Sequence, residues 1–286
     1  MNLVTWNVNR FDGTWDRRRN GCDIEEKERK KYLELIIKKI KKYVKEENDV
    51  AFLQEVPLNQ IAYIQKSFED KELLIKDKKL LIKSWHIEEN PYIISKEDSK
   101  KLNYNAWNLT VAIVTENSNW ELVPFQERNV NYGVAGNEKY NYINRYVELR
   151  NSVSEEKIFG GHFEMYDKND DKKMWEPFEN EIQFTYILGD FNLTAEKWEE
   201  EDGHNIYDVL ENKGYKRLID SDIITNNVCA TSIDNIFVSS KAWKNKSFNT
   251  KVIDYCKVTD KNYNIRYSDH NICITSIKQS DTDQKD

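Results

Sequence analysis

The sequence predicts an α+β fold in which stacked β-sheets are flanked by helices. Many short apolar runs follow one another along the chain with few helical segments between them, and this order favours packed sheets. No repeat, low-complexity linker or Pro/Gly-rich boundary divides the 286 residues. We therefore expect one domain over residues 1–278, followed by a polar tail at 279–286.

Size and cysteine usage indicate a domain that needs no disulfide or structural metal. A domain of this length buries about 75% of the surface that its unfolded chain exposes. The four cysteines are scattered without CxxC spacing, which is typical of free thiols in a reduced compartment. The sequence has neither a signal-peptide pattern at its N-terminus nor an apolar run of about 18 residues. We expect a cytoplasmic monomer without a membrane partner.

The first predicted strand covers residues 3–8 and leads into an arginine-rich loop at 10–21. A helix is expected over 25–47, because apolar residues recur there at helical spacing. The lysines and glutamates around this stripe favour a solvated helix face, with a nucleic-acid-binding surface as the alternative. The stripe consists of Leu33, Ile36, Ile37, Ile40 and Val44.

The rest of the chain continues this pattern of strands with occasional helices. A strand is predicted at 49–56, helices at 57–70 and 195–213, and a surface insertion at 164–180, which is rich in Asp, Lys and Asn. The remaining strands are predicted at 79–85, 109–115, 143–150, 156–163, 182–189, 233–238 and 271–277.

Polar side chains follow three of the predicted strands. Asn7 and Asn9 alternate at the end of the first strand, so the period of two directs both to one face. Glu55 ends a buried run, where a carboxylate is costly unless it is paired or binds a metal. Asp190 and Asn192 alternate after another apolar run. These positions indicate side chains that a scaffold directs into one cleft.

Two further motifs lie near the C-terminus. Asp234 opens the strand at 233–238, and Ser268-Asp269-His270 precedes the last strand. Each motif alone has an ordinary structural explanation, as a turn residue, a capping group or a loop amide. Those explanations account poorly for the joint occurrence of the motifs, each at the end of a strand.

Together the motifs resemble the endonuclease/exonuclease/phosphatase superfamily, which has the deoxyribonuclease I-like fold. This resemblance implies a four-layer α/β-sandwich, in which two packed, mainly antiparallel β-sheets are flanked by helices. It extends over nearly the whole chain. The motifs are Trp6-Asn7-Val8-Asn9, Leu53-Gln54-Glu55-Val56, Gly161-His162, Gly189-Asp190-Phe191-Asn192, Ile233-Asp234-Asn235-Ile236-Phe237 and Ser268-Asp269-His270.

The resemblance also implies a metal site. Glu55 would be the principal ligand of Mg²⁺, with Mn²⁺ as the alternative ion. Asn9 and Asp269 would support the metal directly or through water. A sparse set of oxygen ligands suits Mg²⁺, which keeps several of its waters.

For catalysis, the resemblance implies that Asp190 orients or deprotonates the attacking water. Asn7 and Asn192 would hold Asp190 or the phosphate oxygens. His270 would act as general base or as a donor to the transition state. Asp234 would fix the tautomer of His270 and raise its basicity.

Other residues are expected to contact the substrate. His162 would donate to a phosphate oxygen or to the leaving group, and Arg145 would bind phosphate, with Arg150 as the neighbouring alternative. The arginines at 17–19 could grip phosphates or simply be solvated. Tryptophans beside the motifs could stack on bases or belong to the core; they are Trp15, Trp107 and Trp198.

We expect a Mg²⁺-dependent phosphodiester hydrolase, a nuclease that cleaves DNA or RNA by metal- and histidine-assisted attack of water. The net charge of −7 disfavours a broad basic binding face, but a metal supplies positive charge locally. The alternatives are a phosphatase or phosphodiesterase acting on a small nucleotide, inositol phosphate or lipid headgroup, and a non-catalytic binding protein on the same scaffold.

Overall fold

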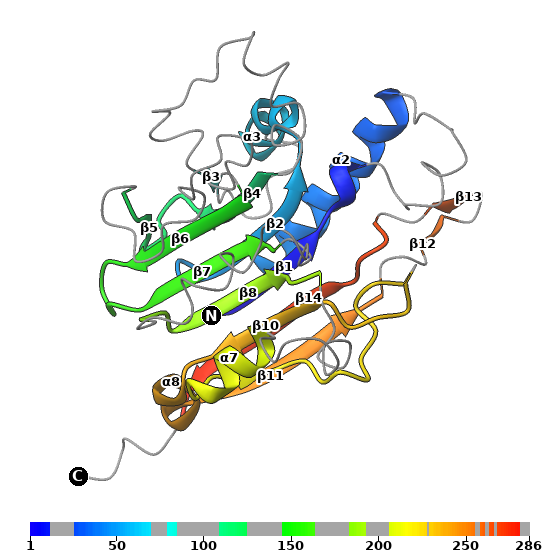
Figure 1. Ribbon diagram of the computed structural model, residues 1–286. Helices are drawn as coiled ribbons and strands as arrows, with labels where there is room; N and C mark the ends of the chain where they lie inside the picture. The colour runs from blue at the N-terminus through cyan, green and yellow to red at the C-terminus, as the bar shows by residue number, and fades with distance from the viewer. Residues whose placement is uncertain are drawn as a thin grey trace, which may run out of the picture.

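In the computed structural model the chain forms two six-stranded β-sheets that pack face to face, with helices on their outer faces (Figure 1). The sheets are mainly antiparallel, as predicted, and each contains one parallel pair. The structure describes residues 1–11, 26–69, 79–84, 109–124, 145–163, 183–192, 206–227, 229–254, 258–260, 263–265 and 268–280.

The first sheet joins strands from the beginning, middle and end of the chain. Its central parallel pair is β1 with β2, so the carboxyl ends of these strands meet at one edge. The spatial order is β11 (Lys246–Ile253), β14 (Ile272–Gln279), β1 (Asn2–Asn7), β2 (Val50–Val56), β4 (Leu109–Thr115) and β3 (Leu80–Lys83).

The second sheet has the same plan, with a parallel pair of β7 and β8 at its centre. The spatial order is β5 (Trp120–Leu122), β6 (Tyr146–Asn151), β7 (Lys157–His162), β8 (Tyr186–Asp190), β10 (Asp234–Val238) and β9 (Lys216–Arg217). Between the sheets lies an apolar layer that includes Leu3 and Phe52 from the first sheet and Leu149 and Leu188 from the second.

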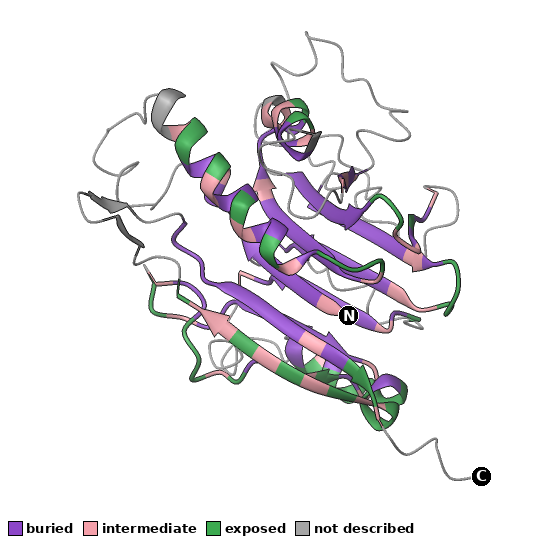
Figure 2. Ribbon diagram, turned by 180° about the vertical axis from the view of Figure 1, so that it is seen from behind, coloured by how far each residue is buried: buried purple, intermediate pink, exposed green. Residues whose placement is uncertain are grey.

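Helices cover both outer faces and complete the four expected layers. On the first sheet lie α2 (Glu26–Tyr43) and α3 (Ile61–Glu69), the latter preceded by the short η2 (Leu58–Gln60). The apolar stripe of α2 packs against the sheet, and the helix has one buried and one exposed side (Figure 2). Most of its described charged residues are exposed or half-buried, but Lys41 is buried and donates to the carbonyl of Ser67 at 3.0 Å. The outer face of the second sheet packs against α7 (Ile206–Asn212). Among the described helices, none is both long and apolar enough to cross a membrane.

Two predicted segments lie partly or wholly outside the described residues, and one boundary differs from its prediction. Of the helix expected at 195–213, the described residues form only α7, and residues 193–205 lie outside the described part, as does the insertion expected at 164–180. Strand β14 extends to Gln279, one residue past the expected end of the domain, because Gln279 pairs with Lys246.

Several short or weakly apolar elements were not predicted from the sequence. Strand β11 alternates half-buried and exposed residues (Figure 2) and carries lysines typical of a protected edge strand, so its apolar signal is weak. The other missed elements are β5, β9, α8 (Ser240–Asn245), β12 (Val258–Asp260) and β13 (Tyr263–Ile265).

Glycines bring the central strands of the second sheet close to their neighbours. A Cβ on Gly160 would lie 2.1 Å from the ring of Phe52 in the opposite sheet. Gly189 has φ of 148°, and its Cβ would lie 1.8 Å from the carbonyl oxygen of Gly161. The next residues in both strands, His162 and Asp190, are therefore held in close register.

Gly189→Ala is expected to lower the free energy of unfolding by about 2–4 kcal/mol, through steric overlap with Gly161 and an unfavourable φ. Urea unfolding followed by tryptophan fluorescence measures this loss. Val153 is 75% exposed, so Val153→Ala serves as a control that should change stability by less than about 0.5 kcal/mol. Equal stability of the two variants would contradict the close approach of β7 and β8.

Candidate active site

Three of the expected site residues lie in one row across the second sheet. His162 is the register partner of Asp190 at the ends of β7 and β8. Asp190 is in turn the partner of Asp234, the first residue of β10. All three side chains are buried. Strand register alone therefore places one histidine and two carboxylates side by side.

The first sheet contributes Glu55 through a bulge in β2. The register between β2 and β4 shifts between Leu53 and Val56, and Glu55 has φ of 54°, in the left-handed region. Such bulges redirect a side chain, and a left-handed conformation costs a residue with a Cβ roughly 1–2 kcal/mol. Strand β2 is therefore irregular at Glu55, the position that carries the carboxylate.

Asn7 connects the two sheets at this point. Its Nδ2 donates to Glu55 Oε1 at 3.1 Å and to Asp190 Oδ2 at 2.8 Å. Its Oδ1 accepts from the backbone N–H of Asn9 at 2.9 Å. Both ends of this fully buried amide are therefore engaged, and its orientation is fixed.

Left-handed backbone also occurs in the two segments that follow β1 and β8. Asn9, Arg10 and Phe11, which form η1 (Asn9–Phe11), have φ of 43°, 57° and 60°, and Asn192 has 53°. The backbone N–H of Asn192 donates to Asp190 Oδ1 at 2.8 Å. Unusual backbone conformations thus gather around the expected site, as they do at functional sites.

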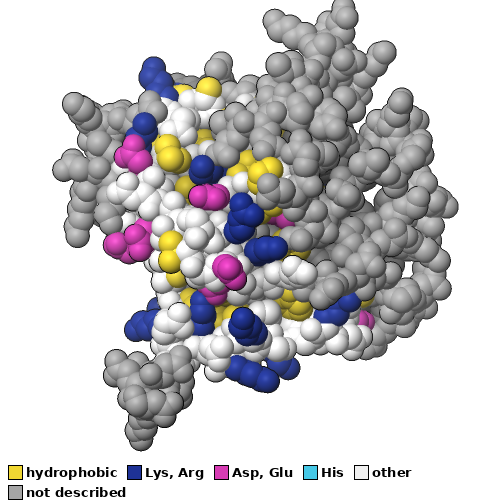
Figure 3. Space-filling model, turned by 90° about the vertical axis from the view of Figure 1, so that its left-hand side faces the viewer, with side chains coloured by type: hydrophobic (Ala, Val, Ile, Leu, Met, Phe, Trp, Pro, Cys, Tyr) yellow, Lys and Arg dark blue, Asp and Glu magenta, His cyan; other side chains and the backbone are white. Residues whose placement is uncertain are grey.

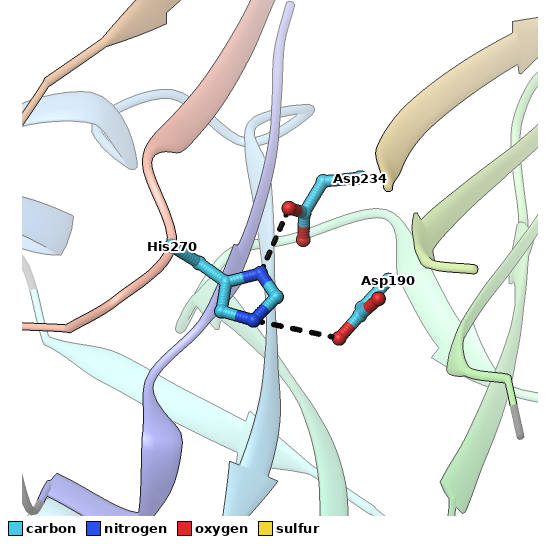
Figure 4. A group of neighbouring side chains, drawn as sticks. All are labelled: Asp190, Asp234 and His270. Atoms are coloured by element: carbon cyan, nitrogen blue, oxygen red, sulfur yellow. Dashed lines mark hydrogen bonds and ion pairs between the residues drawn. The ribbon is translucent and has the colours of Figure 1, made fainter. Parts of the chain in front are cut away.

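His270 reaches the row from the segment before β14. Its Nδ1 lies 2.8 Å from Asp234 Oδ2, and its Nε2 lies 3.8 Å from Asp190 Oδ2 (Figure 4). Although burial alone would lower the pKa of His270, the charges of Asp234 and Asp190 raise it well above the usual value. The two carboxylates therefore favour the protonated, imidazolium form of His270.

Hydrogen bonds from side chains to backbone carbonyls hold the segment of His270 against β1. The indole Nε1 of Trp6 donates to the carbonyl of His270 at 3.0 Å. Ser268 Oγ donates to the carbonyl of Asn7 at 2.7 Å and accepts from the backbone N–H of His270 at 3.1 Å. The serine of the Ser-Asp-His motif thus fixes the histidine in place.

Asp190 and His162 have pKa values shifted by burial. Burial and the charge of Asp234 raise the pKa of Asp190 above its usual value, against the attraction of the two histidines. Burial lowers the pKa of His162, against Asp190 and Glu55. His162 Nε2 lies 3.6 Å from Asp190 Oδ2 and 2.8 Å from Asn192 Nδ2.

Glu55 and Asp269 form a second carboxylate group beside the row. Burial would raise the pKa of Glu55, but electrostatic attraction to His162 and Arg10 and a hydrogen bond from Asn7 lower it. Arg10 Nε lies 3.7 Å from Glu55 Oε2. The pKa of Asp269 is raised by burial and by the charge of Glu55. The two carboxylates repel one another electrostatically, and they offer the oxygen donors that a divalent cation takes.

Among the described residues, one group of three side chains has metal-binding spacing. Ligand atoms of Asp190, Asp234 and His270 all lie within 4.8 Å of one another. However, His270 Nδ1 and Asp234 Oδ2 already share a hydrogen bond of 2.8 Å. This group has the geometry of a histidine oriented by a carboxylate, which favours proton transfer.

Comparison with solved structures gives the fold a name. A protein of the endonuclease/exonuclease/phosphatase family from Leptotrichia buccalis C-1013-b superposes with a TM-score of 0.56 at 17% identity, covering 97% of this chain and 99% of that one. The chain has the endonuclease/exonuclease/phosphatase fold. A family protein from Bacteroides thetaiotaomicron gives a TM-score of 0.55 at 12% identity, with 97% of both chains covered.

Likeness at this level of identity establishes the fold and leaves the activity to the site. The endonuclease domain of TRAS1, a telomere-specific non-LTR retrotransposon, matches with a TM-score of 0.50 at 13% identity over 97% of both chains. No protein-family model matches the sequence, and no curated protein matches it either. The structural matches confirm the endonuclease/exonuclease/phosphatase fold that the motifs predicted.

Of the two arginines considered for phosphate binding, Arg145 is the one that lies near His162. It is buried just before β6, and its charge helps to lower the pKa of His162. Arg150, the alternative, pairs with Lys157 at the start of β7, the opposite end of that strand from His162. The arginines at 17–19 lie outside the described residues, as do Trp15, Trp107 and Trp198.

Three residues at the site were not identified from the sequence. Arg10 directly follows Asn9, so its place beside the first motif could have identified it from the sequence. Thr225 Oγ1 accepts from the backbone N–H of Asp234 at 2.9 Å, and Asn226 Nδ2 lies 3.0 Å from His270 Nε2. These two residues belong to a loop with no strand-end pattern, so nothing in the local sequence pointed to them.

Proposed function

We propose that this chain is a divalent-metal-dependent phosphodiesterase that cleaves nucleic acid. The observation that supports this most directly is the convergence of Glu55, Asp190, Asp234 and His270, from four separate segments, at one edge of the sandwich. Phosphodiester hydrolysis needs an activated water and neutralisation of the charge on the phosphate. The arrangement offers groups for both tasks.

Glu55 and Asp269 would hold the cation, together with Asn9. We propose Mg²⁺, with Mn²⁺ able to replace it, because the donors are oxygens and few in number. Once bound, the ion would neutralise charge on the phosphate and lower the pKa of a coordinated water. The lowered pKa of Glu55 keeps this side chain ionised and ready for a cation.

Asp190 is the proposed group that orients the attacking water and takes its proton. Hydrogen bonds fix both of its oxygens, with Asn7 at Oδ2 and the backbone of Asn192 at Oδ1. A raised pKa increases the affinity of this carboxylate for the proton. His270, oriented by Asp234, is the second proton-transfer group.

His162 and Arg145 are the proposed contacts to the phosphate. The lowered pKa of His162 makes it a neutral hydrogen-bonding group. Arg145 is charged at every relevant pH and suits phosphate oxygens. Asn192 contacts His162 through Nδ2, which also donates to the carbonyl of Phe163 at 2.6 Å, so the histidine has a fixed neighbour.

Nucleic acid is the proposed substrate class, since a retrotransposon endonuclease domain shares the fold. One observation favours a second candidate, a small phosphorylated molecule. The chain carries a net charge of −7, and on the face seen in Figure 3 the described acidic and basic side chains are interspersed. A broad basic surface, which most nucleic-acid-binding proteins use, is therefore missing from the described part of that face.

The chain is expected to cleave plasmid or single-stranded nucleic acid in the presence of Mg²⁺ and to stop when EDTA is added, because the carboxylate pair needs the cation to engage phosphate. Gel assays on supercoiled plasmid, single-stranded DNA and RNA measure this. Metal-dependent release of phosphate from small nucleotides or inositol phosphates, without cleavage of any polymer, would select the second candidate. Equal cleavage with and without EDTA would contradict the metal dependence.

Glu55→Ala and His270→Ala should each reduce turnover by at least about 100-fold while the protein stays folded, since each removes a group that acts in the reaction. Initial rates and circular dichroism measure the two properties together. Asn119→Ala is a suitable control, because Asn119 contacts Asn48 away from the site. Wild-type rates in both site variants would mean that the reaction occurs elsewhere on the chain.

A further inference from the structure

Asn226 contacts the ring nitrogen of His270 that Asp234 leaves unoccupied. Its Nδ2 lies 3.0 Å from His270 Nε2, while Asp234 lies 2.8 Å from Nδ1 on the other side of the ring. Asn226 and His270 are both 5% exposed. The contact is therefore shielded from water and engages the nitrogen that faces Asp190.

The orientation of the Asn226 amide follows from a second hydrogen bond. Its Oδ1 accepts from the backbone N–H of Cys229 at 3.0 Å. A carbonyl oxygen can accept this bond and an NH₂ group cannot, so the NH₂ group faces His270. In the neutral ring Asn226 is then the donor and Nε2 the acceptor, which places the single ring proton on Nδ1 beside Asp234.

The backbone of Asn226 is fixed as firmly as its side chain. It exchanges hydrogen bonds with Thr231 in both directions, at 2.9 and 3.1 Å, and it forms a β-bridge with His270. Asn227 N–H donates to the carbonyl of Asp269 at 2.8 Å, and Asn271 N–H donates to that of Thr225 at 2.7 Å. The turn is thus clamped on both sides of His270.

We propose that Asn226 is a positioning residue for His270, resting on the phosphodiesterase function proposed above. In the neutral ring Asp234 accepts at Nδ1 and Asn226 donates at Nε2, so both nitrogens are engaged and one tautomer is favoured. The ring then presents Nε2 as an acceptor 3.8 Å from Asp190 Oδ2. Asp190 takes the proton of the attacking water, and the neutral His270 ring then accepts that proton at Nε2 in place of the Asn226 amide.

The hydrogen bond is tested by ¹⁵N NMR of the wild-type protein at a pH above the titration of His270, where the ring is neutral. We expect His270 Nδ1 to carry the proton, Nε2 to show the shift of an acceptor nitrogen, and a scalar coupling to connect Nε2 with Asn226 Nδ2. Asn226→Ala should remove the coupling and thereby assign it. A proton on Nε2, with no coupling in the wild type, would overturn the proposal.

Kinetics test the role in the reaction. Asn226→Ala should lower kcat by about 10- to 100-fold, the range for residues that orient a reacting group, and leave KM within about twofold. Asn119→Ala is the control, since the Asn119 side chain contacts Asn48 at 3.4 Å, away from the site. It should leave kcat unchanged even if it lowers the melting temperature. Equal losses of kcat in both variants, or a loss confined to KM, would contradict positioning.

The two measurements separate this inference from the proposed function. Absence of any phosphodiesterase activity in the wild type would remove the proposed function, and the coupling between Asn226 and His270 would still decide the hydrogen bond. Full activity of Asn226→Ala alongside a normal coupling in the wild type would overturn the positioning role and leave the phosphodiesterase function in place.

Discussion

The buried amide of Asn7 joins the two sheets at the point where their central strands end. One NH₂ group donates both to Glu55 of the first sheet and to Asp190 of the second. The remaining site geometry depends on this link, because Asp190 is in register with His162 and Asp234. The same residue also anchors His270, since Ser268 Oγ donates to the Asn7 carbonyl. Interdigitated apolar residues bring the sheets together, and this amide aligns their polar ends.

The site gathers features that cost stability. Carboxylates are buried near one another, which raises the pKa of both Asp190 and Asp269. Glu55 and Asn192 take left-handed backbone conformations. Buried like charges and strained backbone persist only where the surrounding structure enforces them. The glycine contacts between β7 and β8 and the apolar layer between the sheets provide that enforcement, so the fold stabilises a site that would not form by itself.

Sequence reasoning succeeded where burial leaves a strong local signal. The apolar runs of β1, β2 and β8 predicted strands, and the polar residues at their ends predicted a common site. Strand β11 was missed because an edge strand with lysines lacks such a run. Asn226 was missed for a different reason. It meets His270 across 44 positions of sequence, through a turn whose path depends on tertiary contacts, and no periodicity encodes such a meeting.

The central claim is that the edge where both sheets end binds a divalent cation through Glu55 and Asp269. Anomalous diffraction from crystals soaked in Mn²⁺ locates the ion directly, and Glu55→Ala provides the matched crystal. The claim predicts one ion in contact with the Glu55 and Asp269 carboxylates, lost in the variant. An ion held instead by Asp190, Asp234 and His270, or no ion at this edge, would contradict it.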